Sequence, residues 1–211
     1  MSTYSKEHQE YLKKQKKERI IVISSQVLIV LSFLIIWELI VRFHLVNTFL
    51  SSSPIKVLET ITGLIKDHTF FNHIWITTYE TMLSFLIATL IGLIVGAILW
   101  WNKILAKIIE PYLTILNSLP KVALGPLIII WVGASIHSII FMALLITIFI
   151  SIINIYNGFR LTEESYITLL KSLKANKFQI FFKVILPSNY QNIMNTLKVN
   201  ISMSLIGVVL I

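Results

Sequence analysis

Apolar residues in this chain gather into five long runs, which polar and mostly basic segments separate. Each run is close to the roughly 20 residues that a helix needs to cross a bilayer about 30 Å thick. The runs cover residues 20–41, 74–101, 113–132, 136–155 and 190–211. The pattern therefore predicts an all-α, polytopic membrane protein with about five spanning helices.

Composition and charge support a multi-pass protein of the cell membrane. Hydrophobic residues make up 56% of the 211 residues and charged residues only 13%, which is too apolar for an ordinary soluble domain. The net charge of +8 is spread over the ends of the apolar runs, which favours a membrane partner over nucleic acid. Because basic segments face the cytoplasm, we expect residues 1–19 to form a cytoplasmic N-terminus and residues 20–211 a single transmembrane domain.

The segment Leu161–Pro187 is cationic and amphipathic, and it lies between two apolar runs. We call it the coupling segment. Thr162 followed by Glu163 and Glu164 predicts a capped helix start. Asn176 with Gln179 predicts a second cap of the capping-box kind, so two short helices should meet near residues 174–176. The second helix should end at Pro187. An apolar stripe at helical spacing is formed by Tyr166, Leu169, Leu170 and Leu173.

Two interpretations of the coupling segment remain open from periodicity alone. It is either the cytoplasmic element to which a separate ATPase binds, or an amphipathic helix that lies in the lipid interface.

Small residues repeat every fourth position in the second run, at Ser84, Ala88, Gly92 and Gly96. Such a ladder predicts a face for close helix packing.

Two prolines interrupt the third run, and Lys121 stands between them. Broken helices occur at membrane depth only where they are buried in protein or line a cavity, so this interruption is the candidate lining of a pathway. A charge there suggests function, although Lys121 can also extend to the cytoplasmic interface. The candidate lining residues are Ser118, Pro120, Lys121 and Pro126.

The sequence offers no catalytic, cofactor-binding or metal-binding residues. It has no Walker A loop, no H-E-x-x-H and no cysteine. His44, His68 and His73 lack the spacing of a helical metal site. Ser135 near His137 only faintly suggests an intramembrane hydrolase.

Glu38 precedes Arg42 by four residues, which predicts an ion pair on one helix face.

The coupling segment resembles the cytoplasmic signature of ABC importer permeases, which reads E-A-A, then glycine, then L-P. Thr168, Leu169 and Leu170 stand at the E-A-A positions, Lys174 at the glycine, and Leu186-Pro187 at the L-P. Residues 118–133 (SLPKVALGPLIIIWVG) and 50–58 (LSSSPIKVL) are similar to permeases of the nitrate/sulfonate/taurine type. Those permeases commonly carry arginine and glycine where this chain has Glu80 and Ser84.

The resemblance implies the type I importer permease (MetI-like) fold, with a sixth helix that this chain lacks. It also implies an assembly of two permease copies, a cytoplasmic ATPase dimer that binds ATP and Mg, and an extracellular solute-binding protein. The transported solute would be small, like a sulfonate, nitrate, taurine or a vitamin precursor. The coupling residues would be Thr168, Leu169, Leu170, Leu173, Lys174, Ala175, Leu186 and Pro187. The alternatives are a non-transporting membrane scaffold derived from such a permease and an intramembrane enzyme.

Overall fold

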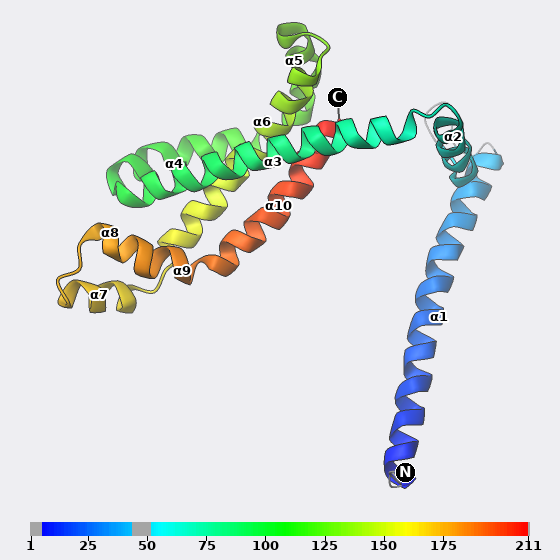
Figure 1. Cartoon of the computed structure of the whole chain (residues 1–211), viewed down its shortest axis with the longest axis horizontal. Coiled ribbons are helices and arrows are strands. Elements are labelled where there is room, and N and C mark those ends of the chain that lie inside the picture. Colours follow the sequence, from blue (N-terminus) through cyan, green and yellow to red (C-terminus); the bar gives the residue numbers. More distant parts are fainter. Residues whose placement is uncertain (1–5, 44–51, 211) are drawn as a thin grey trace. The chain divides into compact units, whose positions relative to one another are not determined.

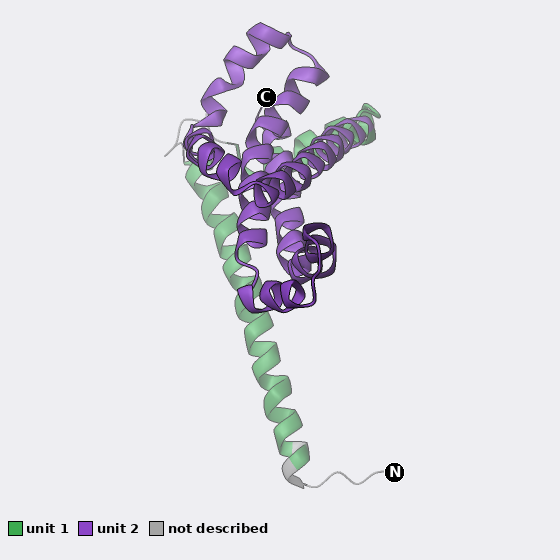
Figure 2. Ribbon diagram, turned by 90° about the vertical axis from the view of Figure 1, so that its left-hand side faces the viewer, with its two compact units in different colours: residues 1–71 green, residues 72–211 purple. Residues whose placement is uncertain are grey.

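The computed structural model describes residues 6–43 and 52–210, and every regular element within these ranges is a helix. The chain divides into two compact units, residues 1–71 and residues 72–211 (Figure 2). The domain boundary expected after residue 19 falls inside α1, which runs without a break from Lys6 to Arg42.

In the first unit, α1 is followed by the short helix α2 (Pro54–Lys66). The Trp37 indole donates to the Ser52 carbonyl at 2.9 Å, and Glu38 Oε2 accepts the Ile55 backbone N–H at 3.2 Å. The expected ion pair between Glu38 and Arg42 is wrong: no such pair joins them in the described part of the chain. The N–H groups in the first turn of α2 have no partner within the helix, so they stabilise a nearby carboxylate. The Glu38 carboxylate binds there instead of pairing with Arg42.

His68 ends α2 in the left-handed conformation, with φ of +57°. Its N–H bonds to the Ile65 carbonyl, and the Thr69 N–H bonds to the Leu64 carbonyl. These two bonds form a Schellman motif, which satisfies carbonyls at the end of a helix. His68 therefore forms part of the turn that ends α2. His44 lies outside the described residues.

The second unit begins with two long helices joined by a tight turn, α3 (Phe70–Trp101) and α4 (Lys103–Ser118). Asn102 caps α4 by accepting the N–H groups of Ile104 and Leu105. A 3₁₀ turn (Lys121–Leu124) and α5 (Gly125–Val132) follow, and the chain bends by 76° between Ser118 and Lys121. The interruption expected at Pro120 is therefore confirmed as a sharp change of direction.

α6 (Ile136–Arg160) packs along α10 (Tyr190–Val209) and against α3 (Figure 1). A Cβ on Gly92 would lie 2.9 Å from Ser151 Cβ, and one on Gly96 would lie 2.8 Å from Ile155 Cγ2. The small residues of α3 thus face α6 so closely that any side chain would collide there. Both contacts advance by four residues on each helix, so α3 and α6 run in the same direction.

A polar seam ties α10 to α3 and α6. Asn200 Nδ2 donates to Thr89 Oγ1 at 3.0 Å and to Ser151 Oγ at 2.9 Å. Thr147 and Ser204 hydroxyls share a hydrogen bond of 3.1 Å. Because the Asn200 Nδ2 group and the Thr147 and Ser204 hydroxyls find partners inside the helix cluster, α10 tolerates more polar residues than a lipid-facing helix could. Asn200 Oδ1 has no hydrogen-bond partner among the described residues.

By length and composition, three described helices can cross a membrane: residues 10–42 of α1, α3 and α6. The bent pair formed by α4 and residues 121–132 makes four if it is one span. The run expected as a fifth span is present as α10, but its seam residues keep it below the hydropathy of the others.

Candidate functional site

The coupling segment folds as two short helices, as its pattern predicts. α7 covers Glu164–Ser172 and α8 covers Lys177–Ile180; a π turn (Phe181–Ile185) and α9 (Leu186–Ser188) continue α8. The expected end at Pro187 is wrong by one residue, since α9 runs to Ser188. In the π turn the Leu186 N–H bonds to the Phe181 carbonyl, and this wider turn accommodates a proline that lacks an N–H and crowds the preceding turn.

The cap at Asn176 is confirmed, and the cap at Thr162 is wrong. Asn176 Oδ1 accepts the Gln179 N–H at 2.8 Å, while Gln179 Oε1 accepts the Asn176 N–H at 2.9 Å. Thr162 Oγ1 instead accepts a hydrogen bond of 2.6 Å from Asn189 Nδ2, and Glu163 is the residue before α7. Thr162 therefore links the start of the coupling segment to its end.

Lys174 occupies the signature's glycine position with φ of +58°, in the left-handed region that glycine favours. The Lys174 N–H bonds to the Lys171 carbonyl at 2.9 Å, and the Ala175 N–H bonds to the Leu170 carbonyl at 3.0 Å. This is a second Schellman motif, with Lys174 at the residue after the cap. The turn that a glycine would make is retained although the glycine is not.

The apolar residues of α7 and of the turn that follows it point in two directions. Leu170 and Ala175, with Ile167, pack against a buried cluster made of Ile155, Phe159, Ile180, Phe181 and Ile185. Leu169 and Leu173 are instead 60% and 69% exposed, and Thr168 beside them is exposed as well. Of the signature's last pair, Leu186 packs against the same cluster and Pro187 is exposed.

The coupling segment is fastened to the ends of α3 and α6. The Lys177 ammonium donates to the Trp101 carbonyl and lies 5.3 Å from the centre of the Trp101 ring. The Phe159 and Phe181 rings meet edge to face at 5.5 Å. The coupling segment therefore contacts the ends of both α3 and α6.

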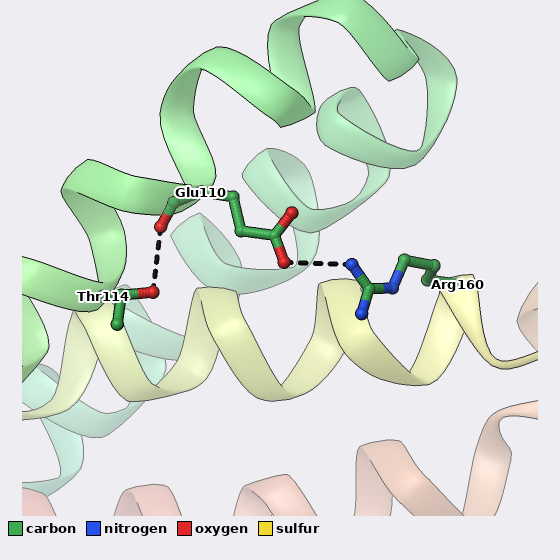
Figure 3. A network of polar contacts seen from close by, with 3 residues as sticks. All are labelled: Glu110, Thr114 and Arg160. Carbon is green, nitrogen blue, oxygen red and sulfur yellow. Dashed lines mark hydrogen bonds and ion pairs between the residues drawn. The ribbon is translucent and has the colours of Figure 1, made fainter.

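An ion pair joins α4 to α6 at the same end of the unit. Glu110 Oε1 and Arg160 Nη1 are 2.9 Å apart, and the Thr114 hydroxyl donates to the Glu110 carbonyl at 3.0 Å (Figure 3). Both charged side chains are about half exposed, so the pair contributes roughly 0–1 kcal/mol to stability. The pair does, however, show that residues 101–111 and 160–188 lie at the same end of the helix cluster.

At the broken helix, Lys121 folds back onto the end of α4. Its ammonium donates to the Asn117 carbonyl at 3.0 Å and to Asn117 Oδ1 at 3.3 Å. It also lies 5.7 Å from the centre of the Phe149 ring on α6. A cation at the carbonyl end of a helix is favourable, so Lys121 stabilises the bend.

α3 carries buried polar groups whose importance the pattern did not reveal. Glu80 and Ser84 are almost fully buried, and within the described residues Glu80 Oε1 and Ser84 Oγ have no hydrogen-bond partner. A buried acid in a spanning helix indicates a functional position. In the sequence both residues are departures from the family's usual arginine and glycine, and Ser84 also belongs to the ladder of small residues.

Neither a metal-binding cluster nor a contact between Ser135 and His137 is found among the described residues. No three His, Asp or Glu side chains of residues 6–43 and 52–210 are grouped to hold a metal ion. Ser135 lies at the start of α6, where its N–H and carbonyl both bond to Ser138 Oγ. In the same ranges no hydrogen bond joins Ser135 to His137.

Comparison with known proteins places this geometry in context. Residues 88–211 match the family described as "Binding-protein-dependent transport system inner membrane component". The chain is 27% identical over 177 residues to the formylaminopyrimidine transport permease protein of Halalkalibacterium halodurans, covering 84% of this chain and 70% of that protein. It is 28% identical over 174 residues to a putative aliphatic sulfonates transport permease protein of Bacillus subtilis, covering 82% of this chain and 63% of that protein.

A third relative is the taurine transport system permease protein of Escherichia coli, 26% identical over 176 residues, with 80% of this chain and 63% of that protein covered. The chain therefore spans about two thirds of the length of these relatives.

Proposed function

This chain belongs to the family of binding-protein-dependent transport system inner membrane components, and we propose that it is the permease subunit of an ATP-driven ABC importer. In this proposal the chain is a multi-pass protein of the cell membrane with a cytoplasmic N-terminus. It pairs with a second permease copy, receives solute from an extracellular binding protein, and is moved by a cytoplasmic ATPase dimer. ATP and Mg bind to that ATPase, and this chain carries out no hydrolysis of its own.

The observation that carries the proposal is the attachment of the coupling segment to the spanning helices. Leu170 and Ala175 enter the cluster around Phe159 and Phe181, and Lys177 bonds to the end of α3. A packed interface of this kind has discrete arrangements rather than a continuous range, so a force on α7 shifts the helices between two states. The match to the family covers the whole coupling segment as well.

The solute we propose is small and either anionic or heteroaromatic. Two relatives are named for the transport of aliphatic sulfonates and taurine, and another for formylaminopyrimidine. The pathway would pass the broken helix between α4 and α5, where Ser118, Pro120, Lys121 and Pro126 lie. A lysine ammonium held at the bend favours a negatively charged solute nearby.

The ATPase would dock on the outer side of α7, through Leu169 and Leu173. These two leucines are the more exposed part of the stripe, and exposed apolar residues on a polar segment indicate a protein contact. Leu170 is unsuitable as a test position because it belongs to the core beneath α7, and a charge there would disturb the fold.

The experiment co-expresses the chain with the ATPase of its transport system and measures how much ATPase co-purifies. Leu169→Asp and Leu173→Asp should each reduce the recovered ATPase at least tenfold, since a charge at the centre of an apolar contact costs more than about 1.4 kcal/mol. Leu161→Asp is the matched control, because Leu161 is 78% exposed and lies outside α7.

Recovery of the control should equal that of the unchanged chain. Full recovery of ATPase with both leucine variants would show that docking takes place elsewhere, whereas no recovery of ATPase with the unchanged chain would favour the non-transporting scaffold.

A further inference from the structure

A basic pocket of about 780 Å³ lies between the coupling segment and the helices it is fastened to. Its walls come from the end of α3, the first half of α4, the end of α6, and α7 with α8. The pocket is therefore formed by elements that the chain brings together only when the coupling segment packs on the helix ends. Leu169 and Leu173, the proposed docking residues, do not line it, and of the signature positions only Thr168 does.

Positive charge dominates the pocket. Five cations line it, at Lys103, Lys107, Arg160, Lys171 and Lys177. Two acids, Glu110 and Glu164, face them. Arg160 is paired with Glu110, and Lys177 donates to the Trp101 carbonyl. The lysines at 103, 107 and 171 form no ion pair with any described residue, so three ammonium groups remain for an anion.

The pocket is also half apolar, and one of its walls belongs to an amphipathic helix. Leu99, Trp100 and Phe159 are among the residues that line it. On α4, Lys103 and Lys107 face the pocket while Ile104 and Ile108 are 74% and 55% exposed on other sides of the helix. In a membrane-spanning chain, exposed isoleucines beside lysines and tryptophans mark the depth of the lipid headgroups.

We propose that this pocket binds the headgroup phosphate of an anionic phospholipid. The three lysines would hold the phosphate, and the apolar wall would receive the glycerol and the first carbons of the acyl chains. Inorganic phosphate would gain nothing from that wall. A bound lipid would join α4 to α7 and so hold the coupling segment against the spanning helices.

The experiment measures lipid binding to the purified full chain in detergent by native mass spectrometry. The probes are phosphatidylglycerol, phosphatidylcholine and inorganic phosphate. Phosphatidylglycerol should bind at least tenfold more tightly than phosphatidylcholine. The variant Lys103→Gln/Lys107→Gln/Lys171→Gln should lose roughly 100-fold in affinity for phosphatidylglycerol, at roughly fivefold for each lysine.

Two matched variants separate the pocket from general charge and from folding. Lys13→Gln/Lys14→Gln/Lys16→Gln removes as many charges from the N-terminal segment and should bind like the unchanged chain. Lys103→Arg/Lys107→Arg/Lys171→Arg keeps the charge and should retain binding. Equal affinity of the pocket glutamine variant and the unchanged chain, equal loss in the N-terminal variant, or loss in the arginine variant would overturn the proposal. Displacement of phosphatidylglycerol by millimolar inorganic phosphate would assign the site to a soluble anion instead.

Discussion

Lys174 holds a backbone conformation that residues other than glycine and asparagine rarely adopt, and the turn survives nonetheless. Two main-chain hydrogen bonds of the Schellman motif fix the turn, and Leu170 and Ala175 on either side of it are held by the core. The left-handed conformation costs a lysine roughly 1–2 kcal/mol. The surrounding contacts therefore hold residue 174 in the left-handed conformation even though it is a lysine.

Glycine should have opposite effects at two lysines that are only three residues apart. Lys174→Gly relieves the left-handed strain and should raise stability by up to about 1 kcal/mol. Lys171→Gly, inside α7, should lower it by about 0.5–1 kcal/mol because glycine weakens a helix. The midpoint of thermal unfolding in detergent checks both variants. A loss of similar size at both positions would contradict the angle assigned to Lys174.

The sequence predicts a side-chain contact when the two residues that form it are close together in the chain. The capping box of Asn176 and Gln179 involves residues three apart, and its pattern is sufficient. Thr162 has the same capping chemistry, but Asn189, 27 positions away, takes its hydroxyl. Likewise, periodicity alone assigns Leu169 and Leu170 to the same apolar stripe. Only the packed core beneath α7 shows that Leu170 is partly buried while Leu169 is exposed.

The helices α3, α6 and α10 approach one another closely at small residues. Gly92 and Gly96 let α3 approach α6 directly, and Gly207 lies against Ala143 in the contact between α10 and α6. Close approach strengthens van der Waals contact, which drives helix association in lipid. The repeat at every fourth residue predicts such a face, whereas the partner helix and the parallel direction of α3 and α6 depend on the whole fold.

Alanine should distinguish packed glycines from free ones. Gly92→Ala places a Cβ 2.9 Å from Ser151 Cβ and should cost about 1–3 kcal/mol, as overpacking does. Gly63→Ala is the control, because a Cβ on Gly63 in α2 meets nothing within 4 Å. That variant should gain about 0.5–1 kcal/mol from helix propensity. The detergent unfolding midpoints should move in opposite directions, and a neutral Gly92→Ala would refute the close packing of α3 on α6.

At the scale of the whole molecule, the positions of the basic segments and the contacts of the second unit agree. The basic residues at the ends of the apolar runs predict that residues 101–111 and 160–198 lie on one side of the membrane. The structure joins these segments through Glu110 with Arg160 and Trp101 with Lys177. Apolar run lengths were enough to predict a helical membrane protein. They could not predict the seam through Asn200, since its Nδ2 group reaches both of its partners only after three helices meet.

The side of the membrane on which the coupling segment lies tests the central claim most directly, because an ATPase can act on it only from the cytoplasm. The chain has no cysteine, so Ser172→Cys and Glu59→Cys each create a single site for a membrane-impermeant maleimide. In intact cells the reagent should label Glu59→Cys and leave Ser172→Cys unlabelled until the membrane is permeabilised. Labelling of Ser172→Cys in intact cells would contradict the account.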